Sequence, residues 1–281
     1  EDINSGLLTF TSDDTVTIEL SDSEKNSGNR EIGTLVNLSE LENGSKYSIS
    51  IIGTDFAGNN SEILLVDQVT YDISPPELII DLPKSESFVN NLEVNYNVNE
   101  PLLIAQMIWI DDKGEKTSFD LRIDDLKTGK NVLRDYGIKT KEGVPYNIII
   151  DATDRANNDA ISDTIRNVMF DVTAPTLTIQ SPVANQVINN DSISFEISEP
   201  IKRGTIKWQA VDGNDSNSPH TRSILGEELK GGSFVGFTFL SSPDLVNGVF
   251  YNIIIEGTDL AGNKSELTIV DKVLFDTIAP E

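Results

Sequence analysis

Cysteine is absent from the 281 residues, and this absence excludes several classes of protein. Without cysteine there is no disulfide framework and no thiolate ligand for a metal. Histidine occurs once, at position 220, so we expect neither a Ser-His-Asp set nor a Cys-His set in a chain of three repeats. We therefore expect a non-enzymatic protein in which His220, with no second imidazole to share a metal, is an ordinary surface residue.

Positive charge is also scarce. The chain has 21 Lys and Arg residues against 46 Asp and Glu residues, which gives a formal net charge of −25. No basic cluster in the sequence could neutralise phosphates, so nucleic acid is not an expected partner. A surface this acidic keeps molecules soluble and mutually repelling.

Long apolar runs and helical periodicity are missing as well. The chain instead has short apolar or alternating runs separated by Gly, Asn, Asp and Pro, which is the pattern of an all-β protein. Between positions 174 and 278 we expect seven strands, the number found in an immunoglobulin-like β-sandwich. Their predicted ranges are 176–180, 192–197, 204–211, 220–225, 233–240, 251–259 and 265–275.

One short motif is present three times. It reads GTDFAGN at 53–59, ATDRANN at 152–158 and GTDLAGN at 257–263, so its Asp residues are 99 and 105 positions apart. A period near 100 residues indicates tandem whole domains, not a solenoid. The sequence therefore predicts an elongated array of immunoglobulin-like repeats.

The repeat boundaries follow from the alignment of the copies. We expect a partial repeat at 1–74 that lacks its first two strands, complete repeats at 75–173 and 174–278, and the start of a further repeat at 279–281. On this interpretation the chain is an excerpt from a longer array, and any signal peptide, anchor or membrane span lies outside it. The six extra residues of the third repeat, between Glu199 and Tyr251, are interpreted as loop variation.

Aromatic residues recur at two positions of the repeat. Trp109 and Trp208, with Phe10 in the first copy, fall on the third strand, where such sandwiches bury an aromatic side chain. A tyrosine opens the sixth strand after a Gly-containing turn, the position of a tyrosine corner. We expect these side chains to be core residues and not an exposed sugar-stacking platform. The tyrosines are Tyr47, Tyr146 and Tyr251.

Three carboxylates recur together in distant parts of the repeat. One lies in the linker before Pro, one in the loop between the second and third strands, and one in the TDxAGN hairpin. In a seven-strand sandwich these three elements meet at one pole, so each joint between repeats gathers three acidic groups. Since no basic residue lies among them, the cluster calls for a hard divalent cation with oxygen ligands, and Ca²⁺ fits better than Mg²⁺.

The candidate ligands include the Asn of the hairpin as a carbonyl donor. They are Asp72, Glu100, Asp154 and Asn158 at the first joint, Asp171, Glu199, Asp259 and Asn263 at the second, and Glu1, Asp55, Asn59 and Asp276 at the two ends. Plain turn chemistry is the alternative, because Asp, Asn and Gly are the residues that turns select. The second repeat lacks the hairpin Gly and places Arg155 beside the cluster, so we expect the first joint to bind more weakly.

The succession of TDxAGN, then YD or FD with SPP or TAP, then SEP resembles the tandem bacterial immunoglobulin-like repeats of giant secreted adhesins and cell-surface proteins. This resemblance covers essentially the whole chain. It implies an extracellular stalk whose joints are stiffened by calcium, with neighbouring repeats of the same chain as the immediate partners and a cell-surface glycan or protein bound through regions elsewhere.

Two other functions stay open at this stage. The loop insertion in the third repeat is compatible with a module that binds a glycan or protein. A donated strand completing the first repeat would make the chain a subunit of an extracellular fibre. A glycosidase using a carboxylate pair is disfavoured, because the carboxylates recur in every copy.

Overall fold

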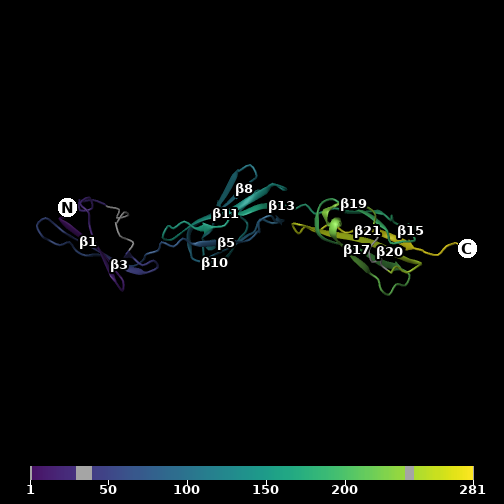
Figure 1. The fold of residues 1–281 in the computed structure, drawn as a ribbon, viewed down its shortest axis with the longest axis horizontal. Helices are drawn as coiled ribbons and strands as arrows, with labels where there is room; N and C mark the ends of the chain where they lie inside the picture. The colour runs from purple at the N-terminus through teal and green to yellow at the C-terminus, as the bar shows by residue number, and fades with distance from the viewer. Residues whose placement is uncertain (1, 30–39, 238–243, 281) are drawn as a thin grey trace.

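The computed structural model describes residues 2–29, 40–237 and 244–280. Figure 1 shows three β-domains in a row, with the N-terminus at one end of the molecule and the C-terminus at the other. No helix in these residues has the length and apolar character needed to span a bilayer. Residues 71–76 and 171–176 lie outside regular structure and connect the domains. The expected all-β architecture of tandem sandwiches is confirmed.

The second repeat is a sandwich of two sheets. One sheet has the order β10-β7-β5-β12 and the other β6-β13-β11-β8-β9, so the fourth long strand, β9, extends the sheet of β8 and β11. The bounds are β5 Glu77–Leu82, β6 Phe88–Val89, β7 Val94–Val98, β8 Leu102–Ile110, β9 Lys116–Asp120, β10 Gly129–Leu133, β11 Pro145–Asp154, β12 Ile161–Ser162 and β13 Ile165–Phe170.

The third repeat has the same plan. Its sheets have the orders β14-β16-β19 and β15-β21-β20-β17-β18. The seven longer strands correspond one to one with the seven predicted runs. Their bounds, with the short β15, are β14 Leu177–Ser181, β15 Val187–Ile188, β16 Ile193–Ile197, β17 Ile201–Asp212, β18 His220–Ile224, β19 Gly232–Phe237, β20 Val249–Asp259 and β21 Thr268–Phe275.

The first repeat contributes a single sheet among its described residues. Its order is β2-β1-β3-β4, formed by β1 Ser5–Thr11, β2 Thr15–Glu19, β3 Lys46–Thr54 and β4 Leu64–Thr70. These strands correspond to the third, fourth, sixth and seventh strands of the complete repeats. With no opposing sheet among the described residues, the apolar side chains of 63–66 are 51–66% exposed.

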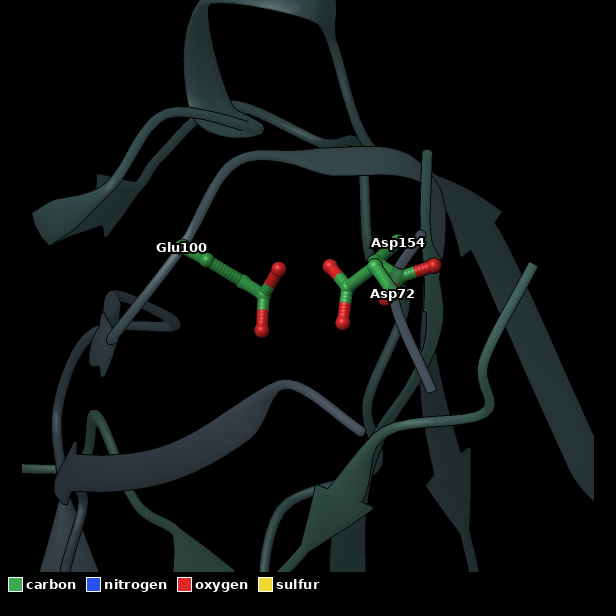
Figure 2. A group of neighbouring side chains, drawn as sticks. All are labelled: Asp72, Glu100 and Asp154. Atoms are coloured by element: carbon green, nitrogen blue, oxygen red, sulfur yellow. The ribbon is translucent and has the colours of Figure 1, made fainter. Parts of the chain in front are cut away.

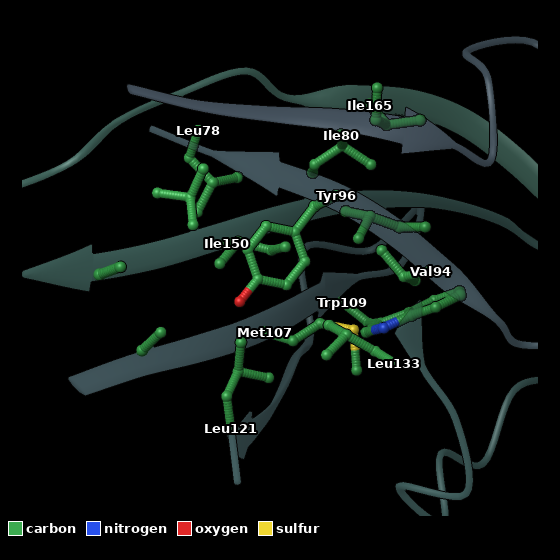
Figure 3. Close-up of a cluster of buried hydrophobic side chains, with 14 of the residues drawn as sticks. Leu78, Ile80, Val94, Tyr96, Met107, Trp109, Leu121, Leu133, Ile150 and Ile165 are labelled. Carbon is green, nitrogen blue, oxygen red and sulfur yellow. The ribbon is translucent and has the colours of Figure 1, made fainter. Parts of the chain in front are cut away.

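The recurrent aromatic residues are core residues, as predicted. Trp109 and Trp208 are each 2% exposed and Phe10 is 8% exposed. Each packs edge-on against the tyrosine that opens the sixth strand, with ring centroids 5.8 Å apart for Trp109 and 6.1 Å for Trp208. Figure 3 shows Trp109 among the buried aliphatic side chains between the two sheets of the second repeat.

The tyrosine corners are also present in all three repeats. Each phenol oxygen accepts a hydrogen bond from a backbone N–H five residues earlier, at 2.8 Å for Tyr47, 2.9 Å for Tyr146 and 2.9 Å for Tyr251. The bond fixes the turn before the sixth strand. Since that turn lies at the pole from which the next linker leaves, the corner also positions the linker.

His220 is not a surface residue, and the sequence-based expectation was wrong. Its side chain is 13% exposed, and its Nε2 lies 2.7 Å from Oδ2 of Asp215, whose side chain is 1% exposed. Tyr251 donates its hydroxyl proton to the same carboxylate at 2.6 Å. The extra residues of the third repeat explain the pair, because twelve positions separate Trp208 from its cross-strand partner His220, against eight between Trp109 and Thr117.

Asp215 gives the third repeat an acid-sensitive contact. Burial raises the pKa of its carboxyl, but hydrogen bonds from Tyr251, His220 and Asn217 outweigh burial and lower the pKa below its ordinary value of 3.8. A carboxyl with a lowered folded pKa stabilises the fold above its unfolded pKa, and the gain is lost as pH falls through the folded pKa.

We therefore expect the melting temperature of the third repeat to fall more steeply below pH 4 in the wild type than in Asp215→Asn. Differential scanning calorimetry at successive pH values measures the difference. If the melting temperatures of the two proteins changed with pH in parallel, ionisation of Asp215 would not contribute to the stability of the repeat.

Candidate metal centre at the repeat joints

Each joint between repeats brings together three carboxylates from separate elements. At the first joint they are Asp72 of the linker, Glu100 of the β7–β8 loop and Asp154 at the end of β11. At the second joint the corresponding residues are Asp171, Glu199 and Asp259. One oxygen from each residue of a group lies within 4.8 Å of the other two. Figure 2 shows the Glu100 side chain extending toward the two aspartates.

The hairpin explains why Asp154 and Asp259 hold their positions. Each is 1% exposed. Oδ1 of Asp154 accepts N–H bonds from Ala156 and Asn158, both at 2.8 Å, and Oδ1 of Asp259 accepts them from Gly262 at 2.6 Å and Asn263 at 2.8 Å. The carboxylate is thus the organising group of the turn as well as a member of the cluster.

The first-repeat hairpin has the same geometry. Oδ1 of Asp55 accepts N–H bonds from Ala57 at 2.9 Å and Asn59 at 2.7 Å. The position of the motif glycine has positive φ in every copy, at 88° for Gly58, 70° for Asn157 and 100° for Gly262. Asn tolerates this left-handed conformation, so the missing glycine leaves the second hairpin unchanged.

The linker aspartates occupy turns of their own. Oδ1 accepts the N–H two residues later, at 3.0 Å in Asp72, 3.1 Å in Asp171 and 3.0 Å in Asp276. Asp72 and Asp171 therefore stabilise a turn and also belong to a group of three carboxylates. Glu1, expected beside Asp55, lies outside the described residues, as does Glu281.

Asn158 and Asn263 tie the hairpin of one repeat to the linker before it. The Nδ2 amide of Asn263 donates to the carbonyl oxygens of Asp171 at 2.9 Å and Thr173 at 3.4 Å, and to Oδ2 of Asp259 at 2.8 Å. Asn158 makes the same contacts with Asp72, Ser74 and Asp154. The sequence missed this role for the amide nitrogen, and ligation through an Asn carbonyl stays a prediction.

Replacing Asn263 by Ala is expected to loosen the second joint at any ion concentration, because the amide bridge to the linker is lost at about 1 kcal/mol per hydrogen bond. Thermolysin digestion followed by mass spectrometry should show faster cleavage near Val172. Asn59→Ala is the matched control, since Asn59 makes the equivalent 2.8 Å bond to Asp55 in the first repeat, away from the second joint. Equal cleavage rates in the wild type and both variants would contradict the bridging role.

The carboxylates within each cluster repel one another. Burial raises the pKa of Glu100, and the negative charges of Asp72 and Asp154 raise it further. Burial also raises the pKa of Glu199, with added repulsion from Asp171, Asp259 and Glu142. In Asp154 burial acts in the same direction, but the amide and N–H donors of the hairpin prevail and lower the pKa. The first cluster thus holds Asp154, whose pKa is lowered, beside Glu100, whose pKa is raised.

Glu142 is a fourth acidic residue at the second joint that the sequence reasoning missed. Its Oε1 accepts the N–H groups of Val172 and Thr173, both at 2.8 Å. The equivalent position carries Asn43 in the first repeat and Asn247 in the third, and both also accept a linker N–H. The difference is visible in the turns ENGSKY, KEGVPY and VNGVFY, where the second residue is Asn, Glu and Asn. The Glu makes the second joint more acidic than the first.

Two further contacts support the second joint. Gly231, at φ +81°, lies against the backbone of Glu199, and a Cβ there would be 2.8 Å from the Glu199 carbonyl carbon. A Cβ on Gly262 would lie 3.5 Å from the amide of Asn90 in the preceding repeat. The first contact places Glu199, and the second brings the hairpin against the neighbouring domain.

The three carboxylates of each group are close enough to share one cation. Two ligands on opposite sides of a calcium ion, each about 2.4 Å away, are at most about 4.8 Å apart. Oδ2 of Asp154 and of Asp259 accepts one amide N–H bond and keeps a second lone pair for a cation.

Comparison with known proteins finds a similarity to one family of domains. Residues 132–217 match the family model of the bacterial Ig-like domain (group 3). The matched stretch begins in the second half of the second repeat and ends within the third, and it includes Asp171 and Glu199. The resemblance that the motifs indicated is confirmed at this level. A search of curated proteins found no match.

Among solved structures, similar chains are tandem β-domains. They are the FN1–FN3 domains of chicken CNTN1 (14% identity, TM-score 0.36, covering 97% of this chain and 89% of that one), a tetra-tandem repeat in the extending region of a large adhesion protein (16%, 0.31, 96% and 68%) and the fibronectin(III)-like modules of Clostridium thermocellum CbhA (14%, 0.36, 71% and 95%).

Proposed function

We propose that this chain is a non-enzymatic extender segment of a large extracellular surface protein, and that calcium at its joints holds successive repeats in a fixed relative orientation. The observation that carries the proposal is the recurrence of one three-carboxylate arrangement at both joints, each time assembled from a linker, a loop and a hairpin. The match to bacterial Ig-like domains supports the placement outside the cell.

The residues that would hold the ion belong to both sides of each joint. Asp72 and Asp171 precede the repeat whose loop and hairpin provide the other carboxylates, so an ion bound by all three connects the linker to the following domain. It would offset the burial and the repulsion between carboxylates that together raise the pKa of Glu100 and of Glu199. Without the ion, three adjacent negative groups and a short linker leave the repeats free to bend.

The size of the effect follows from mass action. For a dissociation constant near 10⁻⁴ M, typical of extracellular modules, a hundredfold excess of free calcium stabilises the bound joint by about 2.7 kcal/mol. This free energy is enough to make the bound orientation dominant. The prolines that follow the linker aspartates add stiffness, because they restrict the chain to extended conformations.

Small-angle X-ray scattering of the chain tests the extender function. We expect the maximum particle dimension to increase as calcium replaces a chelator. The range of particle dimensions needed to fit the scattering should become narrower at the same time. Glu100→Gln with Glu199→Gln serves as the double variant that loses the response. A wild-type profile that is identical in calcium and chelator would contradict the proposal.

A further inference from the structure

A concavity in the third repeat differs in charge from the rest of this acidic chain. It has a volume of about 620 Å³, within the usual range of ligand sites. Its residues come from β17, β18, the residues 225–229 that follow β18, β20 and the segment after the TDxAGN hairpin. They include three exposed basic residues, Lys202, Arg203 and Lys264, of the 21 in the whole chain.

A concavity lies at the same cross-strand position in all three repeats. The cross-strand pair Gly204–Gly257 corresponds to Ala105–Ala152 in the second repeat and Gly6–Gly53 in the first. Concavities of about 230 Å³ and 320 Å³ lie at those positions. The fold therefore provides a recurrent hollow, and the third repeat has the largest of the three.

The charge of the hollow changes from repeat to repeat. In the second repeat it is lined by Asp120, Asp151 and Asp159 with no basic residue. In the third repeat the three cations face one acid, Glu256, whose Oε1 accepts the Thr205 hydroxyl at 3.3 Å. A hollow that is basic in one repeat and acidic in its neighbour is unlike the joint clusters, which keep the same three carboxylates.

The remaining lining groups are hydroxyls and aliphatic side chains. Thr205, Ser223, Thr258 and Ser265 supply hydroxyls, and Leu225 and Leu267, at 63% and 59% exposure, supply apolar surface. An arginine pairs in a bidentate manner with a carboxylate, whereas lysine ammonium groups act as point charges. Hydroxyls exchange hydrogen bonds with ligand hydroxyls.

We infer that this hollow binds a carboxylate-bearing sugar residue, such as a uronic acid. Arg203, Lys202 and Lys264 receive the carboxylate, and the serine and threonine hydroxyls contact the sugar hydroxyls. A second copy of the chain is a poor occupant, because its net charge of −25 repels another copy and the acidic hollow of its second repeat is itself concave. This inference does not depend on the calcium proposal, since no joint carboxylate lines the hollow.

Saturation-transfer NMR with the chain in a chelating buffer tests the inference. The probes are methyl β-glucuronide and methyl β-glucoside, which differ only in the carboxylate. We expect saturable binding of the glucuronide, at least tenfold weaker binding of the glucoside, and weakening of the glucuronide signal as salt screens the charges.

Matched variants localise the site. Lys202→Glu, Arg203→Glu and Lys264→Glu together should weaken glucuronide binding at least tenfold. The control triple of Lys84→Glu, Lys116→Glu and Lys139→Glu changes charge equally at exposed positions of the second repeat and should leave binding unchanged. Circular dichroism and melting temperature confirm that both variants are folded.

Several results would overturn the inference. They are absence of saturable binding, equal binding of the two glycosides, or equal binding by the first triple variant and the wild type. Binding that requires calcium would also overturn it, because the sugar would then be held by an ion at a joint. Sedimentation that shows self-association lost only in the first triple variant would assign the hollow to a second copy of the chain instead.

Discussion

Replacing Glu199 by Gln is expected to have opposite effects on stability in chelator and in calcium. In chelator the variant should melt at a higher temperature than the wild type, because it removes a partly buried charge that Asp171, Asp259 and Glu142 repel. In calcium the variant should melt at a lower temperature, because it loses a ligand. A binding free energy of about 2.7 kcal/mol corresponds to a shift of the order of 10 °C for a domain of about 100 residues.

The pH dependence of the ion-free wild type has a definite sign. The folded pKa of Glu199 is raised, so the folded state binds more protons than the unfolded state near that pKa, and stability falls as pH rises through it. In chelator Glu199→Gln should remove this dependence. Bound calcium should also remove it at neutral pH, because the ion competes with protons for the same oxygens.

Glu100→Gln is the matched variant at the first joint. It should show the same crossing of melting curves with a smaller calcium effect, because Asn43 replaces Glu142 there. Calorimetric melting curves of Glu100→Gln and Glu199→Gln, each recorded in chelator and in calcium, measure these effects. The account of the joints would be wrong if Glu199→Gln were destabilising by the same amount in chelator and in calcium.

Removing Trp208 is expected to have the second large effect, confined to one repeat. The side chain is 2% exposed in a core cluster that contains only residues of the third repeat, whereas Trp109 belongs to a separate cluster in the second. Truncating a buried tryptophan to alanine costs about 3–5 kcal/mol. Because the cores share no residue, Trp208→Ala should destabilise the third repeat by this amount and leave the second repeat unchanged.

Hydrogen exchange followed by mass spectrometry in low urea measures each repeat separately. Protection of β20 should be lost in Trp208→Ala and kept in Trp109→Ala, and protection of β11 should show the reverse. If either variant lost protection in both the second and the third repeat, the two domains would unfold as one cooperative unit. That result would contradict the prediction from separate cores.

The fold was largely predictable because it repeats. Three aligned copies show which positions are constant, and the alternation of apolar residues placed all seven strands of the third repeat. The aromatic positions were predictable for the same reason, since Trp109, Trp208 and Phe10 share one position. The pairing of strands within sheets was harder to predict from the sequence. Which of the two sheets a strand such as β9 joins depends on side-chain packing, and the pattern of apolar residues does not give that packing.

The convergence of three carboxylates could be derived from the sequence, but their surroundings could not. The linker, loop and hairpin positions follow from the order of strands in a sandwich. The Asn263 bridge, the placement of Glu142 and the Asp215–His220 pair depend on side-chain directions in loops. His220 shows the consequence, because a single histidine without metal partners was predicted to be exposed, although the inserted residues turn it toward a buried aspartate.

The basic hollow was missed for a similar reason. Lys202 and Arg203 are about sixty residues from Lys264 in the sequence, so no local cluster of positive charge is visible. The strand pairing that places Gly204 opposite Gly257 brings them to one concavity. A search for basic runs along the chain could not have found it.

The central claim is that calcium fixes the orientation of neighbouring repeats. The most direct test is electron spin resonance distance measurement across the second joint. The absence of cysteine makes Ser118→Cys and Thr221→Cys, both exposed, unique positions for spin labels. We predict a broad distance distribution in chelator and a single narrow one in calcium, with the Glu199→Gln background remaining broad in both. A wild-type distribution that is equally broad, or equally narrow, in chelator and calcium would contradict the account.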